Sequence, residues 1–281
     1  QPNVGVVEVP DHRIDRLVEL FHPKKTIYTT FEFTDIAGLV KGASKGEGLG
    51  NQFLSNIRLT DAICHVVRCF DDADITHVEG SVDPIRDIEI INLELIMADL
   101  QTIENRLSKV ERKAMTNKDK DAIAEVNVLK KLQAALEAGK PVRSLDLEKE
   151  EQLLIKAFNL LTLKPMIYIA NMSDEEIAEP ENNPYYQKVK ELADSEHNQV
   201  VPVCAKIEEE LSGLDKEEKN AFLQELGIPE SGLDKVIKTA YQILNLCTFL
   251  TAGEDECRAW TFRKGMLAPQ CAGVIHTDFE K

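Results

Sequence analysis

Short β-type runs and amphipathic helical segments alternate along most of this chain. Runs rich in β-branched and aromatic residues predict strands at 4–9, 31–35, 62–70, 164–170 and 199–206. Helices with one apolar face are predicted at 10–21, 52–61, 148–161 and 184–194. This alternation favours an α/β fold with a parallel, doubly wound sheet. The run 62–70 is almost continuously apolar, which predicts a central strand that is buried on both faces.

The spacing of apolar residues changes from residue 83 onward. Steps of three and four, typical of a coiled-coil seam, connect Leu93, Ile96, Leu100, Ile103, Leu107 and Val110. After a polar turn at 116–120, a second series follows with Ile123, Val126, Leu129, Leu132 and Leu136. The pattern predicts two long antiparallel helices that project from the α/β body as a hairpin. A purely structural pairing and a docking arm are both compatible with it.

Beyond a helix that ends near Leu246, short β-like runs with Gly and Pro predict a small β-rich domain. We therefore expect four parts: 1–82 and 148–246 as two parts of one α/β domain, 83–147 as the inserted hairpin, and 247–281 as the start of the β-rich domain. Gln1 is not an initiator methionine and the chain opens directly into a strand, so we expect further residues to precede it.

Composition limits the partners of the chain. The 281 residues carry 49 acidic and 33 basic side chains, a net charge of -16, which repels bulk nucleic acid. Contact with RNA would need a local basic patch such as Lys24–Lys25, Lys41 with Lys45, or 106–120, although solvated surface charge is the favoured explanation of each patch taken alone. No apolar run approaches the roughly 20 residues that span a bilayer. No signal peptide is evident and the six cysteines form no C-x-x-C pair, so we expect a cytoplasmic protein without membrane contact.

The predicted strand at 31–35 ends at Asp35, which begins the pattern Asp35-x-x-Gly38. At the carboxyl end of a parallel strand, Asp35 is expected to hold Mg²⁺ through water, and the backbone N–H of Gly38 to approach a terminal phosphate. The loop that follows has four glycines in nine residues, at 42–50, and leads into a helix. This arrangement suits a nucleotide-driven switch. The alternative is a strand that ends in an unremarkable Asp turn.

Two later strands end in Asn171-x-x-Asp174 and in Cys204-Ala205-Lys206. Their order resembles that of P-loop GTPases, in which the first motif reads the guanine base through its carboxylate and braces the pocket with Asn and Lys. The second motif supplies a backbone N–H to the base carbonyl. Here Met172 replaces the bracing Lys, which makes strict guanine selection doubtful.

Over essentially its whole length the chain resembles the YchF/Obg-like ATPase family. The most specific stretches are 35–51, 65–70, 258–260, 268–270 and 273–281. The resemblance implies a P-loop NTPase of the G-domain type, interrupted by a helical hairpin and followed by a TGS domain. It also implies Mg²⁺-dependent hydrolysis of ATP, in preference to or alongside GTP, and association with ribosomes.

Individual residues can be carried over from the family pattern. Asp35 and Gly38 match its switch II motif, and Leu39 stands where many GTPases have a water-positioning Gln, which implies that the catalytic group comes from elsewhere. His77 matches a histidine proposed for that role, the alternative being an exposed loop histidine. Asp174 stands where relatives usually have Glu, so the choice between ATP and GTP stays open, with the neighbouring Glu175 as a possible compensation.

One departure from the family is large. No G-x-x-x-x-G-K-S/T motif occurs, and the resemblance implies that the P-loop and the switch I threonine precede Gln1. Without them, phosphate binding by this chain should fail. The leading hypothesis is an ATPase that docks on the large subunit or the whole ribosome. The acidic net charge favours protein surfaces as the main contact, although the basic hairpin patch could reach ribosomal RNA. The alternatives are a guanine-specific GTPase and a non-hydrolysing interaction module.

Overall fold

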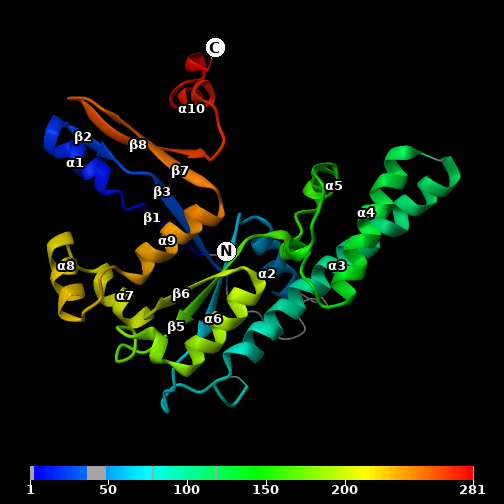
Figure 1. Cartoon of the computed structure of the whole chain (residues 1–281), viewed down its shortest axis with the longest axis horizontal. Coiled ribbons are helices and arrows are strands. Elements are labelled where there is room, and N and C mark those ends of the chain that lie inside the picture. The colour runs from blue at the N-terminus through cyan, green and yellow to red at the C-terminus, as the bar shows by residue number, and fades with distance from the viewer. Residues whose placement is uncertain (1–2, 37–48, 78, 118, 281) are drawn as a thin grey trace.

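The structure is a computed structural model that describes residues 3–36, 49–77, 79–117 and 119–280. Its body is built on three parallel strands, in the order β4 (Ile63–Arg68), β5 (Met166–Asn171) and β6 (Gln199–Val203) (Figure 1). One face packs against α2 (Leu49–Arg58), α3 (Pro84–Asn117) and α6 (Pro184–Glu196), and the other against α9 (Gly232–Ile243). The predicted α/β class with helices on both faces of a parallel sheet is confirmed.

The middle of this sheet is β5, whose first five residues are all buried. Among the described residues, β4 is not the central strand that the run 62–70 predicted, and it is not buried on both faces. β4 pairs only with β5 among the described residues, and Val66 on its outer face is 62% exposed. A continuous apolar run shows that a strand is largely buried, but it does not show which neighbours the strand has.

The strand that carries Asp35 is β3 (Thr30–Asp35), and it pairs antiparallel with β1 (Asn3–Glu8). The expectation of a parallel strand for 31–35 is therefore wrong within the described residues, where β3 forms no ladder with β4. Phe31 and Phe33 nevertheless pack against the core that contains Ile167 and Ile169. β3 thus lies against the body without being hydrogen-bonded to its sheet.

The predicted hairpin is formed by α3 and α4 (Lys120–Glu137), which project from the body as an arm (Figure 1). Asp119 caps α4 by accepting hydrogen bonds from the backbone N–H groups of residues 121 and 122. Most seam residues are buried, but Leu93 and Ile123 are 55% and 41% exposed, so their assignment to the seam is wrong. Near Leu93, α3 turns its other apolar residues, Ile88 and Leu95, toward the sheet rather than toward α4.

Salt bridges connect the two helices along the arm. They join Arg106 to Glu125, Glu111 to Lys130 and Lys113 to Asp119. Since all three pairs are on the surface, each contributes little to stability. The apolar seam between the helices is the main stabilising contact.

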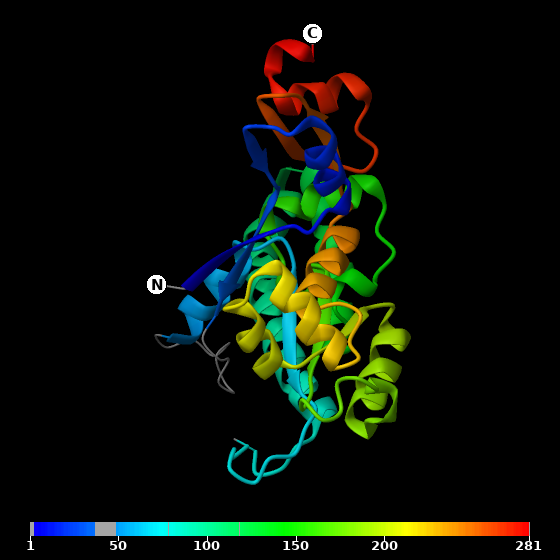
Figure 2. The ribbon, with the colours of Figure 1, turned by 90° about the vertical axis from the view of Figure 1, so that its left-hand side faces the viewer.

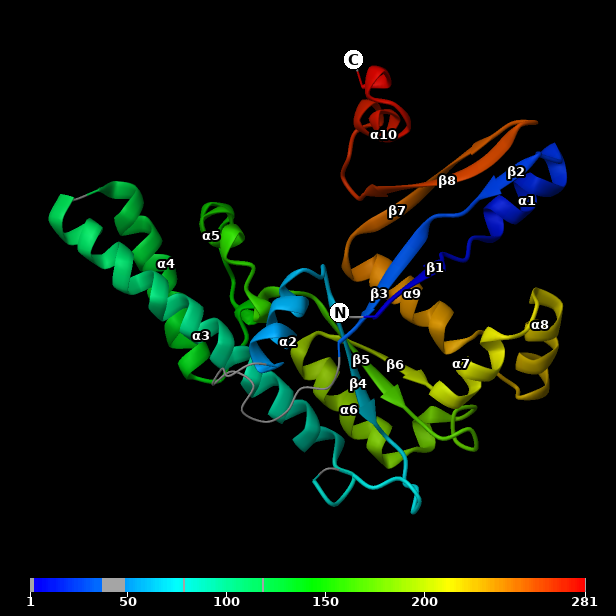
Figure 3. The ribbon, with the colours of Figure 1, turned by 180° about the vertical axis from the view of Figure 1, so that it is seen from behind.

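A second unit is built from both ends of the sequence. β7 (Leu246–Ala252) and β8 (Glu256–Arg263) form a hairpin, and β2 (Lys25–Ile27) adds to β8 in parallel (Figure 3). The amphipathic α1 (His12–Phe21) buries Ile14 against Cys257 and Ala259. Figure 2 shows this unit at one end of the molecule and the segment between β4 and α3 at the other.

Four further α-helices complete the described structure, three within the body and one near the carboxyl end of the chain. They are α5 (Lys149–Ile155), α7 (Ala205–Ser212), α8 (Lys216–Glu225) and α10 (Ala268–Ile275). Within the described ranges, no helix combines the length and the apolar character needed to cross a membrane.

Candidate nucleotide-binding site

The carboxyl ends of β4, β5 and β6 lie side by side. The Cys69 N–H donates to Asn171 O (2.8 Å), and the Met172 N–H donates to Val203 O (2.8 Å). These bonds continue the pairing of the sheet past the last residue of each strand. Because parallel strands end at one edge, the loops that follow them share a crevice, the usual ligand site of α/β sheets.

Asn171 braces two of these loops. Its side-chain Oδ1 accepts a hydrogen bond from the Ala205 N–H (3.0 Å), which joins the end of β5 to the start of α7. The two predicted base-recognition segments, Asn171–Asp174 and Cys204–Lys206, are therefore brought together. The side chain of Met172 is buried in the core, so only its backbone is available to a ligand.

Asp174 and Lys206 form an ion pair with Nζ 2.6 Å from Oδ2. The hydrogen bond from Lys206 lowers the pKa of Asp174, and the same bond raises the pKa of Lys206. The carboxylate that would read a guanine base is thus already engaged by a cation. Both side chains are open to solvent, so a ligand can replace this contact at small cost.

Cys204 contributes position rather than reactivity. It is buried and precedes α7 in extended conformation, and burial raises the pKa of its thiol. A thiol with a raised pKa is a poor nucleophile at neutral pH. A ligand at this segment would therefore meet its backbone and the side chain of Lys206 rather than a reactive thiol.

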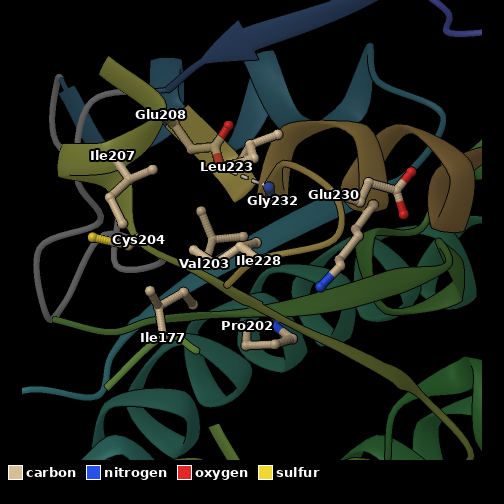
Figure 4. Close-up of a pocket in the computed structure, with 11 residues that line it drawn as sticks. Ile177, Pro202, Val203, Cys204, Ile207, Glu208, Leu223, Ile228, Glu230 and Gly232 are labelled. Carbon is tan, nitrogen blue, oxygen red and sulfur yellow. Dashed lines mark hydrogen bonds between the residues drawn. The ribbon is translucent and has the colours of Figure 1, made fainter. Parts of the chain in front are cut away.

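A small pocket lies behind this segment, lined by residues of β6, α7, α8 and α9 (Figure 4). The carboxylate of Glu208 crosses it to accept hydrogen bonds from the backbone N–H groups of Gly232 (2.6 Å) and Leu233 (3.2 Å). A Cβ at position 232 would lie 2.9 Å from Glu208 Oε1 and 3.0 Å from Val203, so a larger residue would have to displace the Glu208 carboxylate and crowd Val203. The hydrogen bonds of Glu208 across this pocket therefore hold α7 against α9.

His77 is held by both ring nitrogens. Its Nε2 lies 2.8 Å from Asp87 Oδ2, and its Nδ1 accepts the N–H of Glu79 (3.0 Å). The side chain is only 15% exposed. The alternative of a freely exposed loop histidine is therefore wrong, although these contacts do not test a catalytic role.

Asp35 lies exposed at the end of β3, and the next residue, Ile36, packs into the core beneath β4 and β5. No hydrogen bond or ion pair between described residues joins Asp35 to the Asn171 or Cys204 loops. Gly38 and Leu39 lie outside the described residues. No group of three metal-ligating side chains occurs in the described ranges, so a carboxylate for Mg²⁺ is present but a complete donor set is not.

Sequence reasoning missed two polar residues that support this edge. Asn183 is buried, and its amide donates to Cys69 O and Glu176 Oε2, both at 3.0 Å. Asp87 binds His77 from the first turn of α3. Asn183 before Pro184 is recognisable as a helix cap, and Asp87 as a first-turn acid, but neither pattern reveals the partner in another loop.

The parallel sheet and the two joined base-recognition loops define a GTPase-type nucleotide-binding protein. A family model described as "50S ribosome-binding GTPase" matches residues 12–172, more than half of the chain. The YchF-GTPase C-terminal model, described as a protein of unknown function, matches residues 246–281.

Three relatives narrow the class to a family. "Ribosome-binding ATPase YchF" of Bacillus subtilis (strain 168) is 59% identical over 280 residues, covering 100% of this chain and 76% of the relative. The protein of the same name from Escherichia coli O157:H7 is 54% identical over 281 residues, with the same coverage. The solved Schizosaccharomyces pombe YchF GTPase aligns with a TM-score of 0.87 at 42% identity, covering 100% of this chain and 75% of that one. The chain belongs to the YchF family.

Proposed function

We propose that this protein is a Mg²⁺-dependent ATPase that binds the ribosome in a nucleotide-dependent way and acts in the cytoplasm. Relatives at 59% and 54% identity carry the name ribosome-binding ATPase. The observation that carries the proposal is the hydrogen bond from Ala205 to Asn171, which joins the two loops that we propose form the base pocket.

The phosphate half of the site requires a segment outside the 281 residues, which contain no P-loop motif. Between β3 and β4 the described structure leaves one edge of each strand unpaired. A parallel strand from a preceding segment would fit between these edges and would bring its P-loop to the carboxyl ends of the strands. Asp35 and Gly38 would then face Mg²⁺ and the terminal phosphate, as the switch II pattern requires.

The proposed organisation has three parts: an NTPase domain from 1–82 and 148–246, a hairpin insertion at 83–147, and the start of a TGS domain at 247–281. Within the first part, α1 and β2 pack against β8 of the third. The tip of the arm is the part we assign to the ribosome, because the exposed Lys109 and Arg112 lie near it and form no ion pair among the described residues. Phosphate groups of ribosomal RNA are suitable partners for these cations. Co-sedimentation with the large subunit or the whole ribosome, with ATP and with ADP, tests this assignment.

We favour ATP over GTP because Lys206 occupies the carboxylate of Asp174 and Met172 cannot brace a guanine pocket. In the full-length gene product, Lys206→Ala should free Asp174 and shift the ratio of GTP to ATP affinity by about two- to fivefold toward GTP, a small change because both side chains are exposed. Competition of each nucleotide with a fluorescent analogue measures this ratio.

The matched control is Lys188→Ala, which removes an exposed lysine from α6 and should leave the ratio unchanged. If Lys206→Ala leaves the ratio of GTP to ATP affinity unaltered, the ion pair between Lys206 and Asp174 does not influence base selection. If the wild type prefers GTP, the guanine-specific alternative is the better function. If neither nucleotide binds the full-length protein, a non-hydrolysing interaction module is the better function.

A further inference from the structure

The neighbours of His77, the candidate water-activating residue, favour one tautomer of its neutral ring. The Glu79 N–H can only donate, so Nδ1 of His77 must accept and carries no proton. The proton of the neutral ring is therefore on Nε2, from which it is donated to Asp87 Oδ2 at 2.8 Å. The Glu79 N–H and Asp87 together determine the tautomer and the direction of the ring.

Asp87 is itself held firmly. It lies in the first turn of α3, where its N–H donates to Asp83 O (3.1 Å). Its second oxygen, Oδ1, accepts from Arg86 Nη2 at 3.2 Å, and the same guanidinium donates to Ser81 O at 2.6 Å. These contacts fasten the segment that follows His77 to the base of the arm. Asp87 therefore stays in place if the Glu79 contact is exchanged for another.

We propose that Asp87 is a positioning residue for hydrolysis, which keeps the Nε2–H of His77 engaged so that Nδ1 can accept a proton from the attacking water. This inference rests on the proposed function. In the described structure the Glu79 N–H occupies the lone pair of Nδ1, so a water molecule must replace that N–H before His77 can act.

In the reaction, the water oxygen forms a bond to the terminal phosphorus of ATP while the bond from that phosphorus to the bridging oxygen of ADP breaks. One proton of the water moves to Nδ1 of His77, from which it is later released to solvent. The proton on Nε2 remains there, and the negative charge of Asp87 stabilises the imidazolium during the step. The same carboxylate has no direct contact with the reacting atoms.

The test is a double-mutant cycle of ATP turnover in the full-length gene product, with His77→Ala, Asp87→Ala and the double variant. We expect Asp87→Ala to lower kcat about 100-fold, the lower end of a general-base contribution, with KM within about twofold. In the His77→Ala background, adding Asp87→Ala should have no further effect, because Asp87 acts only through His77. Asp87→Asn should fall between wild type and Asp87→Ala.

Glu89→Ala is the matched control, since it removes an exposed carboxylate from the same helix two residues further on. A separate readout is the Nε2 proton of His77 in ¹⁵N-histidine NMR spectra. It should exchange slowly with solvent in the wild type and in Glu89→Ala, and rapidly in Asp87→Ala.

The outcomes separate this inference from the function on which it rests. If His77→Ala is impaired but Asp87→Ala turns over ATP like Glu89→Ala, the inference fails and the proposed function stands. Equal effects of Asp87→Ala in both backgrounds would also overturn it, as would a wild-type ring with its proton on Nδ1. A wild-type protein that hydrolyses no nucleotide would overturn the proposed function and this inference together.

Discussion

Replacing Asp99 by alanine should lower the free energy of unfolding by about 3 kcal/mol. Asp99 is fully buried on α3 and accepts hydrogen bonds from the backbone N–H groups of Leu161 (2.9 Å) and Thr162 (2.8 Å) and from Thr162 Oγ1 (2.7 Å). The variant leaves these donors without an acceptor in the interior. Denaturation by urea, followed by circular dichroism, measures the loss.

Two further variants sharpen this prediction. Burial raises the pKa of Asp99 against the opposing effect of its hydrogen bonds and of Arg58, so its charge is costly to bury. Asp99→Asn removes that charge while keeping an acceptor, and should lose less than half as much stability as Asp99→Ala. Glu104→Ala, at an exposed position on the same helix, should change stability by no more than about 0.5 kcal/mol. An Asp99→Ala protein as stable as Glu104→Ala would contradict a stabilising role for the buried hydrogen bonds of Asp99.

His65 should make the protein sensitive to mild acid. The residue is buried on β4, its Nδ1 has no hydrogen-bond partner among the described residues, and its ring centre lies 5.8 Å from that of Tyr168. Burial lowers the pKa of His65 to about 4, with Asp87 opposing the shift and Arg143 adding to it. Because the folded state keeps the ring neutral, its stabilising effect is present above pH 6.5 and is lost as the pH falls toward 4.

The expected loss from this group is about 1.4 kcal/mol per pH unit below 6.5, or about 2 kcal/mol at pH 5. His65→Leu, of similar volume, should therefore lose about 2 kcal/mol less than the wild type between pH 7 and pH 5. Unfolding curves at both pH values measure the difference. His12→Gln, at an exposed position, should follow the wild type. A His65→Leu protein with the wild-type pH dependence would show that the fold does not lower the pKa of His65.

Local pattern predicted much of this structure. Apolar spacing located the arm, since Ile103, Leu107, Leu129 and Leu132 repeat at helical intervals and are buried between α3 and α4. The strand that carries Asp35 was also located from its β-type run, and the loops at 171–174 and 204–206 were located because each follows such a run.

Pairings between distant segments could not be predicted in this way. β2 has only three residues and gains its place from β8, more than 200 residues later in the chain. The contact of His77 with Asp87 depends on the path of the intervening segment, which has no periodic pattern. In the described structure β4 pairs only with β5, which was missed because hydrophobicity reports burial, whereas strand order depends on which other strands are present.

The helix α3 connects the features on which the functional account depends. Its first turn carries Asp87, its middle carries Asp99, and its far end forms the tip of the arm. Arg58, at the end of α2, donates to Thr102 Oγ1 at 3.2 Å, which joins the helix that follows the glycine-rich segment to the same element. Nucleotide chemistry and ribosome docking would therefore act on one continuous helix.

The most direct test of the account is calorimetric titration of the full-length gene product and of the 281-residue chain with ATP and with GTP, both with Mg²⁺. We expect ATP to bind tightly to the full-length protein, GTP to bind less well, and neither to bind the 281-residue chain, which has no P-loop motif. Absence of binding to both forms would contradict the proposed ATPase and leave an interaction module as the better account.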